Sequence, residues 1–301
     1  MLNGVIVIHK ESGFTSHDVV AKMRGICGQK KIGHTGTLDP EATGVLPVCL
    51  GSATKLCDML ADKDKEYVAE LLLGVETDTQ DTTGKVLFRR PVEASEAQVR
   101  ACAASFLGEY AQIPPMYSAL KVDGKKLYEL ARAGREVERK ARLCFIHELE
   151  ILELRLPVVK LRVVCSKGTY IRTLCADIGT KLGCGGTMQS LVRTRVGKFA
   201  LENAVTLSAL QGLRDESRLS EVLLPVDSMF GDCPKLHIQD TFRKLLDNGN
   251  AFYPSQTVEN EIYAPGRWVR AYGQDEGFAG IYAYEAEKRR YQPVKMFLEK
   301  E

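Results

Sequence analysis

The most informative stretch of this chain is Gly33-His-Thr-Gly-Thr-Leu-Asp-Pro-Glu-Ala-Thr43, which Gly44 closes. Its glycines allow tight turns and a close approach of the backbone to a ligand. Pro40 fixes the chain after Asp39 and favours an extended conformation for Asp39 itself. The pattern predicts a stiff loop that presents one carboxylate, with His34 five residues before it. Such a loop often carries chemistry, although the same residue types also make ordinary turns.

The composition is that of a globular protein of 301 residues, with 45% hydrophobic and 27% charged residues and a net charge of +2. This length suits one large domain, or a large domain with a small appendage. No apolar run reaches the roughly 18 residues that span a bilayer. The chain passes from Met1 to a strand-like Val5-Ile-Val-Ile8 without the features of a signal peptide. We therefore expect a cytoplasmic protein that does not contact membranes.

Nothing in the sequence predicts a bound metal or nucleotide cofactor. The nine cysteines are odd in number and never spaced as Cys-x-x-Cys, so we expect buried thiols in a reducing cytoplasm. The segment Thr77-Asp-Thr-Gln-Asp-Thr-Thr-Gly84 lacks the spacing of a calcium loop and predicts a turn. Neither a phosphate-binding loop nor a dinucleotide fingerprint occurs.

Basic residues gather in three places. The segment from Lys121 to Arg142 contains eight basic and four acidic residues, which gives it a local charge of +4. Smaller groups are Arg193, Arg195 and Lys198, and residues 288–290. Such groups attract phosphates independently of sequence. Solvated helix faces have the same composition, so these patches alone do not settle RNA binding.

Hydrophobic periodicity predicts an α+β protein with a large mixed or antiparallel sheet flanked by helices. Ser16 is the expected N-cap of the first helix, and Ser95-x-x-Gln98 is a capping box for another. Further helices are expected near residues 127–133 and after Gly168. The expected strands cover residues 4–9, 45–50, 67–73, 141–154 and 158–165.

A change in composition near residues 225–234 marks a second unit. Beyond it, residues 268–272, 278–284 and 291–297 form short aromatic stretches separated by Gly, Asp and Glu. Stretches of this length and spacing favour a small β-barrel of about 65 residues.

The Asp39 loop resembles the catalytic loop of the TruB family of tRNA pseudouridine synthases. The resemblance continues through Thr43-Gly-Val-Leu-Pro47 and Gly51-Ser-Ala-Thr-Lys55. The C-terminal stretches Gly277-Phe-Ala-Gly-Ile-Tyr-Ala and Gln292-Pro-Val-Lys-Met-Phe297 resemble the PUA module of RNA-modifying enzymes. The family implies a pseudouridine synthase fold over residues 1–230, with an RNA-clamping segment at 110–145, and a PUA-like domain at 236–301.

The resemblance also implies roles for single residues. Asp39 matches the nucleophile, and Arg172, in Gly168-Thr-Tyr-Ile-Arg-Thr173, matches the arginine that pairs with it. Tyr67 matches the aromatic residue that stacks on the base and is a candidate for proton transfer at C5. The remaining matches are residues expected to bind the substrate: His34, Tyr170, Leu191 and Lys10. The family usually has Asp-Lys-Pro where this chain has His9-Lys10-Glu11.

The implied function is conversion of the T-loop uridine 55 of tRNA to pseudouridine, by a monomer that recognises the shape of the T-arm. No group is oxidised or imported, so no cofactor is expected. Four basic residues would contact the RNA backbone: Lys121, Lys125, Lys126 and Arg132. The alternative is a tRNA-binding folding chaperone, which has no use for the acid at Asp39. RNA-guided relatives carry long basic extensions, whereas this chain ends at Glu301.

Overall fold

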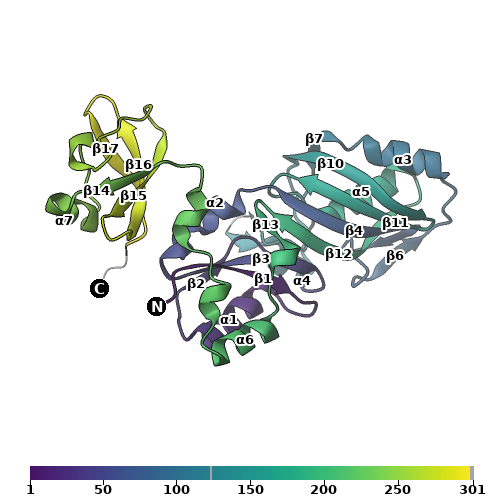
Figure 1. Cartoon of the computed structure of the whole chain (residues 1–301). Helices are drawn as coiled ribbons and strands as arrows, with labels where there is room; N and C mark the ends of the chain where they lie inside the picture. The colour runs from purple at the N-terminus through teal and green to yellow at the C-terminus, as the bar shows by residue number, and fades with distance from the viewer. Residues whose placement is uncertain (123, 299–301) are drawn as a thin grey trace.

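A nine-stranded mixed sheet forms the body of the computed structural model, which describes residues 1–122 and 124–298 (Figure 1). The parallel pair in this sheet is β12 with β3, and its other pairs are antiparallel. The predicted mixed sheet with flanking helices is therefore confirmed. The main order is β1 (Gly4–Lys10), β3 (Thr43–Leu50), β12 (Gly186–Val196), β4 (Lys65–Leu73), β11 (Val158–Cys165), β10 (Arg142–Arg155) and β7 (Gly108–Gln112), with β2 (Ile32–His34) beside β3 and β13 (Phe199–Ala200) beside β12.

Two groups of helices cover this sheet. Apolar side chains of α1 (Ser16–Cys27) and α6 (Leu207–Asp215) pack on β1 and β3. Those of α3 (Glu96–Ala104) and α5 (Ile171–Lys181) pack on β4, β10 and β11. Figure 1 shows α1 and α6 below the strands, α5 behind them and α3 at the upper right. Shorter helices are α2 (Cys57–Ala61), α4 (Leu127–Arg132) and α7 (Arg243–Asp247).

The N-cap of α1 is Thr15, so the prediction of Ser16 was wrong by one residue. The Thr15 hydroxyl accepts a hydrogen bond from the Asp18 backbone N–H, and the Asp18 carboxylate accepts one from the Thr15 N–H. This reciprocal pair is a capping box with an acid at its third position. Ser16 is buried instead, and its hydroxyl accepts the backbone N–H of Leu38 at 2.9 Å. The capping box of Ser95 and Gln98 is confirmed.

Strand β12 was not predicted, although it joins the two halves of the sheet. Its alternation is interrupted by two bulges, between Met188 and Ser190 and between Arg193 and Arg195. Each bulge shifts the side-chain period by one residue and hides the strand pattern in the sequence. The strand brings buried Arg193 directly opposite Tyr67 of β4.

The C-terminal unit contains a four-stranded sheet that lies to one side of the large sheet (Figure 1). Three of its strands were predicted, and β14 was not. In the described residues no pairing joins β14 to β17, so a closed barrel is not confirmed. Ile281 and Phe297 pack in one apolar cluster with Val45 and Leu56 of the larger unit. The order is β14 (Lys235–Ile238), β15 (Trp268–Gly273), β16 (Phe278–Glu285) and β17 (Arg290–Met296).

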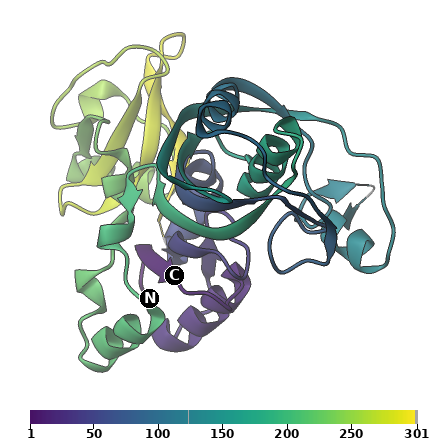
Figure 2. The ribbon, with the colours of Figure 1, turned by 90° about the vertical axis from the view of Figure 1, so that its right-hand side faces the viewer.

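The remaining hairpins lie at the margins of the molecule. Strands β5 (Val75–Thr77) and β6 (Val86–Arg89) flank the predicted turn at residues 77–84. Strands β8 (Lys121–Val122) and β9 (Lys125–Lys126) lead into α4, and this segment projects from the body in Figure 2. All nine cysteines are free thiols. Among the described residues, no helix is both long and apolar enough to cross a membrane.

Candidate active site

Asp39 and Arg172 form a bidentate ion pair. The Nε of Arg172 lies 2.9 Å from Asp39 Oδ2, and Nη2 donates to Oδ1 at 3.0 Å. The arginine side chain is 5% exposed, whereas that of Asp39 is 36% exposed. Two parallel charge-assisted bonds fix the plane of the carboxylate. The structure thus brings together two residues 133 positions apart that the sequence assigned to one site, and leaves the acid open on one side.

The guanidinium of Arg172 also joins two further loops. Its Nη1 donates to the Thr79 carbonyl at 3.1 Å, and Nη2 donates to the Tyr117 carbonyl at 2.8 Å. The carboxylate of Asp81 lies 3.6 Å from Nη1. Because five fixed donors leave little rotational freedom, these contacts hold the arginine in one orientation.

Asp81 is a site residue that the sequence did not reveal. It lies in the turn at 77–84, where its Oδ1 accepts hydrogen bonds from the hydroxyls of Thr79 and Thr83 at 2.8 and 2.5 Å. Nothing in a threonine-rich turn predicts that its acid will lie beside a distant arginine. Two carboxylates therefore share the charge of Arg172, which makes the arginine the common counter-ion.

The pKa of Asp39 is raised from its ordinary value. Burial is the largest cause, Arg172 opposes it, and the negative charge of Asp81 adds to it. Desolvation disfavours the charged carboxylate, and the guanidinium favours it. Burial and Asp81 thus favour the protonated carboxyl, whereas Arg172 favours the carboxylate. A carboxylate that an arginine holds in place and that is open on one side is suited to nucleophilic attack.

Buried contacts on both sides hold the loop that carries Asp39. Lys10, which is fully buried, donates from Nζ to the Pro40 carbonyl at 2.8 Å. The Ser16 hydroxyl accepts the Leu38 N–H at 2.9 Å. The residues before and after Asp39 are thus both anchored. Lys10 lies beneath the loop, and its hydrogen bonds there are to the backbone carbonyls of Glu11 and Pro40.

Lys10→Met is expected to remove a contribution to stability that rises between pH 8 and pH 10. Burial lowers the pKa of Lys10 from 10.5 to about 8. Between these values the unfolded chain binds more protons, so the free energy of unfolding rises with pH, by up to about 3 kcal/mol for this group. Urea unfolding at pH 7 and pH 10 measures the difference. Other groups titrate in the same range: burial also lowers the pKa values of Lys65 and Lys198, and it raises those of buried thiols such as Cys165 and Cys175, which act in the opposite direction. The comparison is therefore between the variant and the unaltered enzyme, and an equal change from pH 7 to pH 10 in both would contradict the assignment.

Tyr67 lies at the floor of the site on β4. Alternate residues of β4, from Lys65 to Leu73, are buried on the face that packs against α5. Tyr67 is 8% exposed and shares its apolar cluster with Leu38 and Leu191. Burial raises the pKa of its phenol to about 12, while the positive charge of Arg193 opposes that rise. The strand pattern therefore places the predicted Tyr67 and Leu191 together.

Tyr170 and His34 lie at the rim. Gln112 brackets the Tyr170 backbone, donating to its carbonyl at 2.9 Å and accepting its N–H at 2.8 Å. The Tyr170 side chain is half-buried, and the charge of Asp39 adds to the burial that raises the pKa of its phenol. Burial lowers the pKa of His34, whose Nδ1 accepts the Gly36 N–H at 3.3 Å. A neutral imidazole is thus held at the start of the loop.

The group of Arg193, Arg195 and Lys198 lies only partly on the surface, with Arg195 half-buried and Lys198 exposed. Arg193 is only 1% exposed, so it cannot reach an RNA backbone. Arg195 pairs with Glu66 at 3.3 Å, and Lys198 donates to the Ser228 carbonyl at 2.5 Å. Composition counts charges, whereas burial decides which of them solvent or RNA can reach.

The segment around β8, β9 and α4 keeps its basic side chains on the surface. Lys121, Lys125 and Arg132 are exposed. Lys126 is half-buried and donates to the hydroxyl of Tyr128 at 3.2 Å, and the Arg132 guanidinium lies over the same ring. Asp123, one of the four acids counted in this segment, lies outside the described residues.

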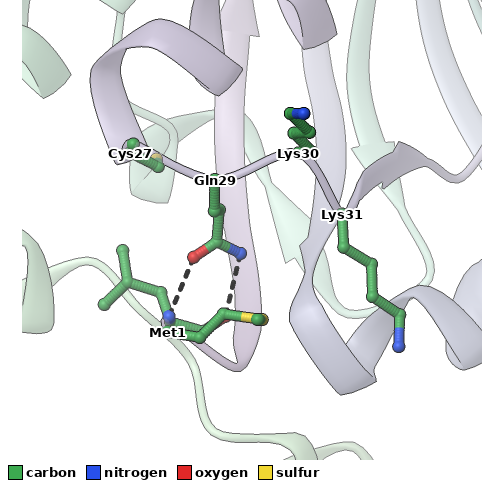
Figure 3. A pocket seen from close by; sticks show the side chains of 7 residues that line it. Met1, Cys27, Gln29, Lys30 and Lys31 are labelled. Carbon is green, nitrogen blue, oxygen red and sulfur yellow. Dashed lines mark hydrogen bonds between the residues drawn. The ribbon is translucent and has the colours of Figure 1, made fainter.

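A hollow of about 710 Å³ lies elsewhere, against the C-terminal end of α1 (Figure 3). Gln29 closes one side through hydrogen bonds to the backbone of Leu2, donating to its carbonyl at 3.0 Å and accepting its N–H at 2.8 Å. Lys30 and Lys31 stand at its rim. None of the predicted site residues lines this hollow, and it has no part in the chemistry around Asp39.

Comparison with known proteins supports the same reading. The family description "TruB family pseudouridylate synthase (N terminal domain)" matches residues 24–171, and "tRNA pseudouridylate synthase B C-terminal domain" matches residues 172–231. A protein of Lachnoclostridium phytofermentans named tRNA pseudouridine synthase B is 51% identical, over 99% of this chain and 100% of that protein. One of the same name from Alkaliphilus oremlandii is 46% identical over the full length of both chains.

Solved structures show the fold. A chain in the structure of an H/ACA ribonucleoprotein bound to a substrate RNA containing 2′-deoxyuridine has a TM-score of 0.71 and 25% identity, over 98% of this chain and 85% of that chain. A chain in an archaeal box H/ACA complex has a TM-score of 0.70 and 27% identity, over 98% and 86%. The expected pseudouridine synthase fold is thereby confirmed. This fold, the two family matches and the relatives that are about half identical over their whole length all show the same family. The chain belongs to the TruB family of pseudouridylate synthases, which are isomerases.

Proposed function

We propose that this enzyme converts uridine 55 in the T-loop of tRNA to pseudouridine, with Asp39 as the nucleophile. The observation that carries the proposal is the bidentate pair of Asp39 and Arg172 at the open end of a half-buried site. Pseudouridine formation detaches uracil at N1, turns the ring and reattaches it through C5. A carboxylate that forms a covalent intermediate divides this rearrangement into two easier steps.

The other residues of the site have complementary roles in this proposal. The ring of Tyr67 stacks on the flipped base, and its oxygen receives the C5 proton. Leu191 and Tyr170 complete the wall of the base pocket. His34, at the rim, contacts the displaced nucleotide and helps to fill the stack that it leaves, which offsets an unstacking cost of a few kcal/mol. Lys10 supports this pocket through its bond to the Pro40 carbonyl.

Two surfaces would bind the rest of the tRNA. The exposed lysines and arginines of the segment at 110–145 contact the T-arm backbone, because they are charged, solvated and project from the body (Figure 2). The C-terminal sheet would act as a PUA-like RNA-binding domain at residues 236–301. We propose that the enzyme works as a cytoplasmic monomer without a cofactor.

The test is to incubate one tRNA transcript with the enzyme and locate pseudouridine by mass spectrometry after a pseudouridine-selective label. We expect one modification, at position 55, and none in a transcript with cytidine there. Modification at another uridine would contradict the specificity, and no modification at all would contradict the function. The alternative, a folding chaperone, predicts that tRNA refolding improves equally with Asp39→Asn.

Replacing Lys125, Lys126 and Arg132 together by Gln is expected to weaken the binding of all tRNAs alike. Each lost phosphate contact lowers the log–log salt slope of binding by up to about 0.9, so the slope should fall by roughly one to three units. Turnover at saturating tRNA should change little, because none of the three residues lies in the base pocket. Filter binding at several salt concentrations measures the slope.

The matched control for this triple variant is Lys22, Lys30 and Lys31 replaced by Gln, which removes the same charge from exposed positions at α1 and just beyond it. We expect its slope to stay near that of the unaltered enzyme. Equal losses in both variants would show that total charge matters and that the segment has no special contact with RNA.

A further inference from the structure

Arg193 is a buried, charged residue that has no part in the roles proposed above. Its side chain is among the largest that are fully buried, at 1% exposure. In the described parts of the chain, 1–122 and 124–298, its guanidinium forms no ion pair with a carboxylate; Tyr67 is the titratable group with which it interacts. Burying a charge without a counter-ion is costly unless its surroundings compensate for it.

The groups that accept hydrogen bonds from Arg193 are neutral and come from both halves of the site. Its Nε donates to the Val45 carbonyl at 2.7 Å, Nη2 to the Gly36 carbonyl at 3.3 Å and Nη1 to the Thr37 carbonyl at 3.5 Å. Tyr67 is its cross-strand neighbour on β4, close enough for the charge of Arg193 to act on the phenol. One residue therefore bonds to the loop that presents Asp39 and pairs with the strand that presents Tyr67.

The backbone fixes this arrangement from two sides. Arg193 faces Tyr67 directly in the pairing of β12 with β4, and faces Gly44 in the parallel pairing with β3. A Cβ at Gly44, where φ is +109°, would lie 2.2 Å from the Arg193 carbonyl oxygen. Only glycine permits this approach. The backbones of β3 and β12 are consequently held close together beside the Asp39 loop.

We propose that Arg193 is a positioning residue that holds the Tyr67 oxygen against the catalytic loop and supplies the counter-charge for its phenolate. The inference rests on the proposed role of Tyr67 in the isomerisation. In that step the C5–H bond breaks, and its electron pair re-forms the C5=C6 double bond of the uracil ring. The phenolate arises when Tyr67 gives its own proton to N1 of the detached uracil. The C5 proton then passes to the phenolate oxygen, which restores the neutral phenol, so that one proton has moved from C5 to N1.

The electrostatics of the pair agree with this role. Burial, with the negative charge of Asp39 as a smaller contribution, raises the pKa of Tyr67 to about 12, and Arg193 is the group that lowers it. A buried guanidinium without a carboxylate partner becomes fully compensated only when the phenol beside it is ionised. The anion that Arg193 lacks in the resting enzyme would thus form at Tyr67 during the reaction.

The test is a double-mutant cycle with Arg193→Lys and Tyr67→Phe, assayed by single turnover on RNA with protium or deuterium at C5 of the target uridine. Alone, Arg193→Lys should slow the reaction by about 10²-fold. Its deuterium isotope effect should also rise, because C5–H cleavage then limits the rate. In the Tyr67→Phe background the same change should cost almost nothing, since residues that act through one group are not additive.

Arg195→Lys is the matched control, because Arg195 lies on the same strand and pairs with Glu66 on the half-exposed face. It should react at the unaltered rate. Additive losses in the cycle, or an unaltered isotope effect in Arg193→Lys, would overturn the proposal and leave Arg193 a structural support of the loop. A fast Tyr67→Phe beside a slow Arg193→Lys would also overturn it, while leaving the isomerase function and Asp39 untouched.

A melting curve accompanies each variant, because the bonds from Arg193 to the loop also support the fold. If Arg193→Lys is poorly folded, the whole cycle is repeated in trimethylamine N-oxide, which favours the buried state. The non-additivity and the isotope effect are ratios within one solvent, so the criteria stay the same.

Discussion

An Asp39→Asn variant is expected to lose isomerisation almost completely while it still binds tRNA. The amide has nearly the shape of the carboxylate but does not form the covalent intermediate. Removal of a covalent nucleophile lowers kcat on the order of 10⁵- to 10⁶-fold in other enzymes. Binding should stay within a few-fold, because it depends on phosphate and shape contacts away from the acid. Single-turnover kinetics and filter binding on the same tRNA measure the two effects.

The fold should survive this substitution, because Arg172 keeps its bonds to the carbonyls of Thr79 and Tyr117 and its neighbour Asp81. Glu41→Gln is the matched control: it removes an exposed carboxylate two residues further along the same loop. That variant should react at the unaltered rate. Turnover of Asp39→Asn near that rate would refute the nucleophile assignment.

The large elements were predictable where the alternation stays regular over several residues. In β4, alternate residues are buried, and the two-residue period placed Tyr67 on the inner face. The strands of residues 142–155 and 158–165 were predicted to within one residue because a short turn joins them. Strand β12 was missed, and two bulges interrupt its pairing with β4. Strand β10 also has two bulges, in its pairing with β11, but its 14 residues leave enough regular alternation to be recognised.

The missing parts of the site depend on contacts between distant segments. Asp81 belongs to a turn that would look the same if it faced solvent, and only tertiary packing places it beside Arg172. Arg193 counted as a surface charge, because arginine is seldom buried without an anion. The resemblance supplied Asp39 and Arg172, whereas the groups that hold them, such as Ser16 and Arg193, came only from the structure.

Arg172→Met is expected to abolish activity and to destabilise the fold, because it removes the common counter-ion of two carboxylates. Breaking one partner of a buried pair typically costs 3–5 kcal/mol, and about 3 kcal/mol is expected here, since the Asp39 side chain stays 36% exposed. Without the guanidinium, burial and the charge of Asp81 would raise the pKa of Asp39 further. A larger share of the nucleophile would then be protonated and inactive.

The sign of the pH effect separates this explanation from simple loss of packing. A carboxyl whose pKa is higher in the folded than in the unfolded state makes the folded chain bind more protons, so stability rises as the pH falls. The deficit of Arg172→Met against the unaltered enzyme, measured by urea unfolding, should therefore be larger at pH 8 than at pH 5.

The matched control is Arg218→Met, which removes an exposed arginine that also pairs with two carboxylates, Glu216 and Glu221. It should stay close to the unaltered enzyme at both pH values, because solvent screens that group. An equal deficit of Arg172→Met at pH 5 and pH 8 would mean that lost packing, rather than two unpaired acids, destabilises the site.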